Sequence, residues 1–100
     1  MTLPRIAETG DVRIQSLEVA TDHFQVKLML RGLIFHSSIV AESIRVVDEG
    51  KSTRILVEMA STHPDKSGSF TVSVPLPPDI EKVTFGLSGE QIWSREYRFQ

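Results

Sequence analysis

The sequence predicts an all-β domain built as a sandwich of about seven short strands. Three observations carry this prediction. Apolar and polar residues alternate with a period of two in several stretches, turn-forming residues recur about every eight to twelve residues, and no stretch requires a helix. A length of 100 residues allows a single domain. We expect residues 1–10 to form a flexible N-terminal tail or a loose first strand, and residues 11–100 to form the sandwich.

The composition is that of an ordinary soluble globular domain, with 40% hydrophobic residues. The net charge is −2, so the chain lacks the basic excess that favours nucleic acid, and we expect no nucleic-acid partner. The absence of cysteine excludes disulfides and thiolate metal sites. The chain shows no run of about 18 apolar residues and no signal-peptide pattern. We therefore expect no membrane insertion, and the compartment stays open.

Two long strands are expected in the first third of the chain. The first begins at Val12, alternates through Ile14 and changes phase near Ser16, which indicates a β-bulge. Turn-forming residues 21–23 end it. The second strand has the clearest alternation in the chain. We expect its buried face to consist of Phe24, Val26, Leu28 and Leu30.

Residues 37–49 fit both a helical stripe and an inward strand face, and we favour the strand. The deciding feature is the Glu49-Gly50 pair, which lies between the β-branched stretches 44–47 and 52–57 with the spacing of a hairpin. A loop of two or four residues keeps the apolar residues of both strands on one face, whereas a loop of three residues does not.

The loop of two or four residues also predicts which residues of this hairpin lie opposite each other. Val46 pairs with Thr53, and Arg45 lies directly opposite Arg54. Two arginines in that position repel each other unless a carboxylate or an anion relieves them. The carboxylates that could do so are Glu42 and Glu58. The basic residues that would extend this face, if the second strand lies nearby, are Lys27 and Arg31. The arginine-bearing face is therefore a candidate surface for an acidic partner.

The second half of the chain is predicted to add three strands. Residues 61–68 form an exposed loop, and the next strand alternates apolar and polar residues until Pro75 ends it. The inward residues of the following strand are expected to be Val83, Phe85 and Leu87. A turn at residues 88–90 leads to the last strand, at residues 91–99.

The register of the last strand is open between two alternatives. A two-residue turn pairs Phe85 with Ile92 and turns Trp93 outward, whereas a three-residue turn pairs Phe85 with Trp93 and buries it. Trp93, Arg95 and Tyr97 share one face of the strand. We favour a buried face that belongs to the core. If the face is exposed, its composition is typical of a protein interface or of a platform that stacks on sugar rings.

Across residues 11–99, this succession of short strands and turns resembles the immunoglobulin-like and fibronectin type III-like superfold. The resemblance implies a small immunoglobulin-like antiparallel β-sandwich of about seven strands. No functional residue is carried over from it. The Cys…Trp…Cys spacing of antibody domains is absent, and the lone Trp93 lies near the C-terminus instead of in the third strand.

Residues that could carry enzyme chemistry form no recognisable motif. The three histidines are His23, His36 and His63. No two of them have the spacing of a metal-binding motif, and no serine lies in a nucleophile motif. Whether His63, Asp65 and Asp79 converge at one end of the sandwich is left open. We expect no enzyme activity, no cofactor and no metal ion.

These absences favour a non-enzymatic protein-interaction or structural module. We expect it to present a sheet edge, or the strand face that carries Arg45 and Arg54, to another protein. An exposed edge would also permit a homodimer by strand pairing. The alternative is binding of a carbohydrate or another small ligand through exposed aromatic residues of the last strand.

Overall fold

The computed structural model describes residues 5–34, 39–61 and 68–95. These residues form eight strands and one short 3-10 helix, so the predicted all-β class is confirmed. The elements are β1 (Arg5–Ile6), η1 (Thr9–Asp11), β2 (Val12–Asp22), β3 (Gln25–Ile34), β4 (Ile39–Asp48), β5 (Ser52–Ser61), β6 (Ser69–Pro75), β7 (Lys82–Phe85) and β8 (Glu90–Ser94).

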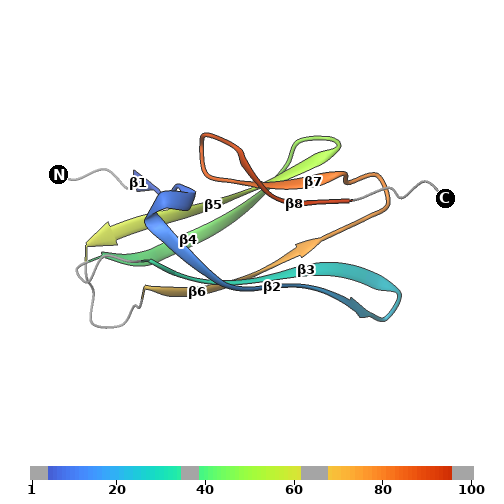
Figure 1. Cartoon of the computed structure of the whole chain (residues 1–100), viewed down its shortest axis with the longest axis horizontal. Helices are drawn as coiled ribbons and strands as arrows, with labels where there is room; N and C mark the ends of the chain where they lie inside the picture. The colour runs from blue at the N-terminus through green and yellow to red at the C-terminus, as the bar shows by residue number, and fades with distance from the viewer. Residues whose placement is uncertain (1–4, 35–38, 62–67, 96–100) are drawn as a thin grey trace.

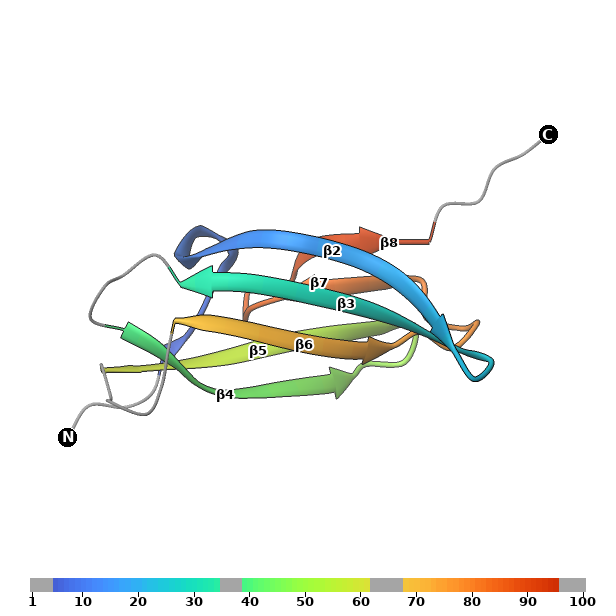
Figure 2. The same ribbon diagram turned by 90° about the horizontal axis from the view of Figure 1, so that it is seen from below.

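The strands form two packed sheets, as the sequence predicts (Figure 1, Figure 2). One sheet has three strands in the order β2-β3-β6. In the other, β5 lies between β4 and β7, β8 follows β7, and the short β1 pairs with the end of β5. Neighbouring strands are antiparallel except β5 and β7, which run parallel. The sequence does not predict this parallel pair, because the alternation of side chains is the same for both strand directions.

The core lies between the two sheets and is built from side chains that point inward. On β6 every second residue is buried, which is the alternation that the sequence predicts. The largest fully buried side chains are Phe85, Leu28, Leu30, Ile55, Val57, Val74 and Val83. Phe70 of β6 stacks on Phe85 of β7, with ring centroids 6.4 Å apart, and this contact joins the two sheets. Burial of this apolar surface is the main force that holds the sheets together.

β2 and β3 form a hairpin with the expected bulge. The register shifts between Ile14 and Ser16, where the sequence pattern changes phase. The turn, however, consists of His23 and Phe24, whose φ angles are 49° and 69°. Positive φ at both positions is the geometry of a type I′ turn, which matches the twist of two antiparallel strands. The expectation that Phe24 belongs to the buried strand face is therefore wrong, and β3 begins at Gln25.

β4 and β5 form the predicted hairpin, and the described part of the segment with the ambiguous pattern, Ile39–Asp48, is a strand and not a helix. The predicted register is wrong by two residues. The turn consists of Gly50 and Lys51, so Val46 lies opposite Ile55 and not opposite Thr53. The cause is Gly50, whose φ of 92° suits the first position of a two-residue turn. A shift of two residues keeps the same faces together, which is why the alternating pattern does not reveal it.

Neither register considered for the last strand is correct. β7 and β8 are joined by a four-residue turn that begins at Gly86 and ends at Gly89, and these glycines have φ angles of 78° and 72°. Phe85 therefore pairs with Glu90. A further register shift within the pair places Trp93 opposite a fully buried valine of β7. Trp93 thus faces the interior side of its sheet.

The segment before β2 packs against the five-stranded sheet. Ala7 is fully buried, and its N–H donates to the Val57 carbonyl at 2.8 Å. The Glu8 carboxylate accepts hydrogen bonds from the backbone N–H groups of Leu87, at 3.0 Å, and Ser88, at 3.3 Å. Leu87, which we expected to point inward, is exposed in the β7–β8 turn. Glu8 therefore holds that turn against the N-terminal segment.

Candidate functional site

The two arginines of the predicted basic face lie on the five-stranded sheet but do not oppose each other. Arg45 lies opposite Leu56, because the hairpin register is shifted by two residues, and the predicted pairing with Arg54 is wrong. Arg45 forms an ion pair with Glu58, in which Nε and Oε1 are 3.2 Å apart. Glu58 is one of the two carboxylates that the sequence offers for this role.

Arg54 makes contacts inside the domain. Its Nη1 donates hydrogen bonds to the carbonyl oxygens of Gly86, at 3.3 Å, and Leu87, at 2.8 Å. Its Nε lies 3.1 Å from Oε2 of Glu49, an ion pair that lacks hydrogen-bond geometry. Arg54 thus ties the β4–β5 turn to the β7–β8 turn, and its guanidinium is engaged before any partner arrives.

Lys27 and Arg31 do not extend the arginine-bearing face. Both lie on β3, in the three-stranded sheet, whereas Arg45 and Arg54 lie on β4 and β5 in the other sheet. The four cationic side chains are therefore divided between the two layers of the sandwich.

The different surroundings of the two arginines predict different stabilities for their alanine variants. Arg54→Ala removes two charge-assisted hydrogen bonds and is expected to lower the free energy of unfolding by about 1 to 2 kcal/mol. Arg45→Ala removes one exposed ion pair and is expected to cost less than about 0.5 kcal/mol. Urea denaturation of both variants measures the difference. Equal losses would contradict the internal role of Arg54.

In the described part of the last strand, Trp93 is half-buried and packs against the core. Arg95 covers the indole ring, with its guanidinium carbon 5.5 Å from the ring centroid. Arg95 Nε donates to the carbonyl of Ile80 at 3.1 Å, and Nη2 donates to the carbonyl of Pro77 at 3.3 Å. Tyr97 lies outside the described residues. The structure therefore brings Trp93 and Arg95 together in one packed unit.

The loop site that the sequence leaves open falls largely outside the described residues. His63 and Asp65 lie outside the described residues. Asp79 is described, and it is exposed in the turn after β6. The described residues contain no group of three or more His, Cys, Asp or Glu side chains that could hold a metal ion. Within the same ranges, no helix has the length and apolar character needed to cross a membrane.

The tip of the β2–β3 hairpin leaves apolar residues uncovered on the inward-facing side of its sheet. Val19 lies opposite the fully buried Leu28 and points the same way, yet it is 52% exposed. Val26 lies two residues before Leu28, on the same side of the strand, and is 37% exposed. Phe24 is fully exposed. Figure 2 shows this turn at the end of the sandwich where the chain leaves β6. Among the described residues, the hairpin thus extends beyond the part of the sandwich that buries it.

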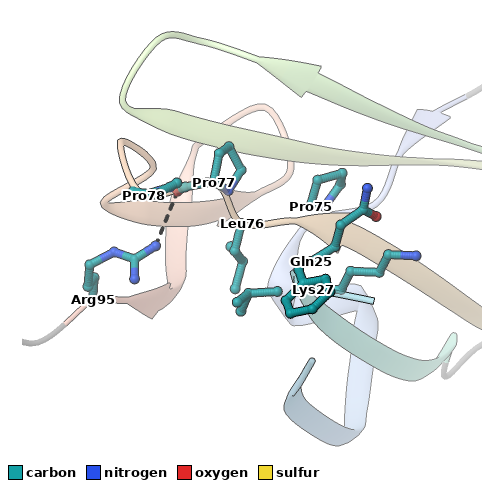
Figure 3. A pocket seen from close by; sticks show the side chains of 9 residues that line it. Gln25, Lys27, Pro75, Leu76, Pro77, Pro78 and Arg95 are labelled. Atoms are coloured by element: carbon teal, nitrogen blue, oxygen red, sulfur yellow. Dashed lines mark hydrogen bonds between the residues drawn. The ribbon is translucent and has the colours of Figure 1, made fainter. Parts of the chain in front are cut away.

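A groove of about 550 Å³ lies between this tip and the segment that follows β6 (Figure 3). Its apolar lining consists of Phe24, Val26, Pro75, Leu76, Pro77 and Pro78. Figure 3 shows Arg95 toward one end and Gln25 and Lys27 toward the other, with Leu76 between them. The N–H of Leu76 donates to the Val26 carbonyl at 2.8 Å, which holds the two walls together. The volume is typical of sites that bind a ligand, about 300 to 1,000 Å³.

Phe24 is held in a backbone conformation that costs stability. Positive φ is uncommon outside glycine and costs about 1 to 2 kcal/mol for a residue with a Cβ atom. Type I′ turns favour Asn-Gly, whereas this chain has His23 and Phe24 at the two positions. Burial does not offset the cost, because the Phe24 side chain is fully exposed. The exposed Phe24 side chain, on a backbone position that disfavours phenylalanine, is therefore a candidate functional residue.

Sequence reasoning misses Phe24 because it lies in phase with the buried strand residues Leu28 and Leu30. The signal that could have found it is the symmetry of the flanking strands. A two-residue turn at His23 and Phe24 places Val19 opposite Leu28, apolar against apolar. The other apolar wall comes from a segment far away in the chain, and no local pattern predicts that approach.

A scan against protein-family models, a search of the curated proteins and a search of the solved structures each found no match. The functional interpretation therefore rests on the geometry of the groove and on Phe24.

Proposed function

We propose that this domain is a non-enzymatic protein-interaction module that holds a partner protein in the groove between the β2–β3 tip and the segment after β6. The observation that carries the proposal is Phe24, which is fully exposed and has a φ of 69°. The positive φ closes the β2–β3 turn, but asparagine or glycine meets that requirement at lower cost than phenylalanine, and the exposed ring adds no burial. A partner that covers the ring accounts for a phenylalanine at this position, because the turn presents the ring and binding removes it from water.

The groove suits a side chain or a short segment of a protein. Pro75, Pro77 and Pro78 restrict the backbone of one wall, because proline fixes φ. A wall that is already ordered loses little conformational entropy on binding. Exposed aromatic residues contribute much of the binding energy at many protein interfaces. These features support a preformed site with Phe24 as its main contact.

An immunoglobulin-like or fibronectin type III-like fold is part of this proposal. Two packed sheets, and a candidate site on a turn at one end of the sandwich, support it. The parallel pairing of β5 with β7 is a departure from an all-antiparallel sandwich. The proposed site does not depend on the superfold, because local contacts between β3 and the segment after β6 build the groove.

The other surfaces expected from the sequence stay predictions. On the arginine-bearing face, Arg45 is paired with Glu58 and Arg54 is bonded to backbone carbonyls. A homodimer by edge pairing of the last strand would use β8, which with β4 is an outer strand of the five-stranded sheet in the described region. Carbohydrate binding through the last strand would use Trp93, which packs against the core beneath Arg95. Phe24 is more accessible than any of these groups.

Phe24→Asn tests the proposal. Asparagine tolerates positive φ better than phenylalanine, so the free energy of unfolding is expected to stay the same or to rise by up to about 1 kcal/mol. Partner capture is expected to fall by about tenfold or more, because a central aromatic contact commonly contributes about 2 kcal/mol. Quantitative mass spectrometry of proteins retained by the immobilised domain and by the variant measures capture, and thermal unfolding measures stability.

Leu87→Asn is the matched control. Leu87 is another large exposed hydrophobic residue, but it lies in the β7–β8 turn and does not line the groove. Its replacement is expected to leave partner capture unchanged. The proposal is wrong if both variants lose the same partners, or if Phe24→Asn retains all of them.

A further inference from the structure

The charged side chains that line the groove are all of one sign. Lys27 and Arg95 are the ionisable residues among those that line it in the described structure, and both are cationic. They lie toward opposite ends, with Leu76 between them (Figure 3). The whole chain, by contrast, carries a net charge of −2. The groove therefore combines positive charge with apolar surface on a domain that is acidic on balance.

Arg95 is oriented before a partner arrives. Its Nε and Nη2 donate to the carbonyls of Ile80 and Pro77, and its guanidinium lies over the ring of Trp93. Within the described part of the chain, Nη1 makes no hydrogen bond, so its N–H groups are available to an anionic group. A guanidinium that is already oriented loses little entropy when it forms an ion pair.

We infer that the partner segment is an acidic peptide, an extended segment in which an apolar side chain is flanked by aspartate or glutamate. The apolar side chain packs against Phe24, Val26 and Leu76, and a carboxylate at one end pairs with Arg95. A carboxylate at the other end extends to Lys27, which alternates with Val26 and lies on the outer side of β3 at the rim of the groove. This inference rests on the proposed function and adds the chemistry of the partner to it. Complementary charge speeds association and selects against basic partners.

An acetylated heptapeptide in which leucine and phenylalanine lie between flanking aspartates is the probe. It is titrated into the full chain and followed by calorimetry and by the emission of Trp93, the single tryptophan, which lies beneath Arg95. We expect saturable binding that weakens as the salt concentration rises. The same peptide with lysine in place of aspartate is expected to bind about tenfold more weakly or worse.

Lys27→Glu and Arg31→Glu are the matched pair of variants. Both reverse one charge on β3, but Lys27 lines the groove and the exposed Arg31 does not. Lys27→Glu is expected to weaken binding of the aspartate peptide by about tenfold and to strengthen binding of the lysine peptide. Arg31→Glu is expected to change either affinity by less than about twofold. Thermal unfolding confirms that both variants are folded.

The inference is overturned if the lysine peptide binds as tightly as the aspartate peptide, or if both variants lose affinity equally. Absence of binding by the aspartate peptide at about 1 mM also overturns it. A concentration-dependent dimer that Phe24→Asn abolishes would assign the groove to a second copy of the chain instead. The proposed function is tested separately. It fails if Phe24→Asn captures partners as well as the unaltered domain does, whether the groove prefers the aspartate or the lysine peptide.

Discussion

Phe85→Ala is expected to lower the free energy of unfolding by about 3 to 5 kcal/mol, the usual cost of truncating a buried phenylalanine. Phe85 is fully buried and stacks on Phe70 of the opposite sheet, with centroids 6.4 Å apart. It also lies on β7, which has a paired strand on both sides. A cavity at that position cannot collapse easily, because its walls are themselves packed. Urea denaturation followed by circular dichroism measures the loss.

Leu87→Ala serves as the control for this variant. Leu87 lies two residues further along the chain and is 63% exposed, so its truncation is expected to change stability by no more than about 0.5 kcal/mol. A loss below about 1.5 kcal/mol for Phe85→Ala would place the Phe85 ring outside the core.

Gly86→Ala is expected to lower the free energy of unfolding by about 3 kcal/mol, from two causes that add. Gly86 has a φ of 78°, and a residue with a Cβ atom adopts such an angle at a cost of about 1 to 2 kcal/mol. The added Cβ would also lie 2.9 Å from the carbonyl oxygen of Ala7 and against the Glu8 carboxylate. Overpacking of this kind costs about 1 to 3 kcal/mol. Urea denaturation measures the sum.

Gly50→Ala separates the two causes. Gly50 has a φ of 92°, but a Cβ atom added there would meet nothing within 4 Å. Only the conformational cost remains, and the expected loss is about 1 to 2 kcal/mol. Equal losses at the two glycines would show that the segment around Ala7 does not press on the β7–β8 turn.

The strands themselves could be predicted because burial of one face imposes a period of two. The alternation of β6 and the bulge before Ser16 follow from that rule. The register of the β4–β5 hairpin could not be predicted, because a shift of two residues leaves Val46 on the same face. The deciding feature was the conformation of Gly50, and the sequence does not show at which turn position a glycine lies.

The arrangement of the strands could be predicted less well than their positions. The parallel direction of β7 relative to β5 could not be predicted, because apolar and polar residues alternate in the same way in parallel and antiparallel strands. The four-residue turn between β7 and β8 has glycine at both ends, and only the second, Gly89, lay in the predicted turn. Because the turn begins at Gly86 and not at residue 88, Leu87 lies in the turn and is exposed, whereas the sequence predicts an inward position for it.

The candidate site could be predicted only in part. The sequence places Arg95 on one strand face with Trp93, whereas the structure places it at a groove built with Phe24 and Leu76. The walls of this groove come from segments distant in the chain, so their contact depends on how the strands are arranged in the two sheets. The roles of Arg45 and Arg54 depend in the same way on a register that alternation does not determine.

The parallel pairing of β7 with β5 has a consequence for how the chain reaches its native state. Ser52 pairs with Lys82, 30 residues later in the chain, whereas β2–β3 and β4–β5 are closed by tight turns. Contacts of long sequence separation carry a larger loop-closure cost, so both hairpins can form well before β7 docks. During synthesis, β5 therefore emerges with its Ser52–Ile55 edge unpaired, and that edge can associate with other nascent chains until β7 covers it. The docking of β7 thus removes an unpaired strand edge as well as extending the sheet.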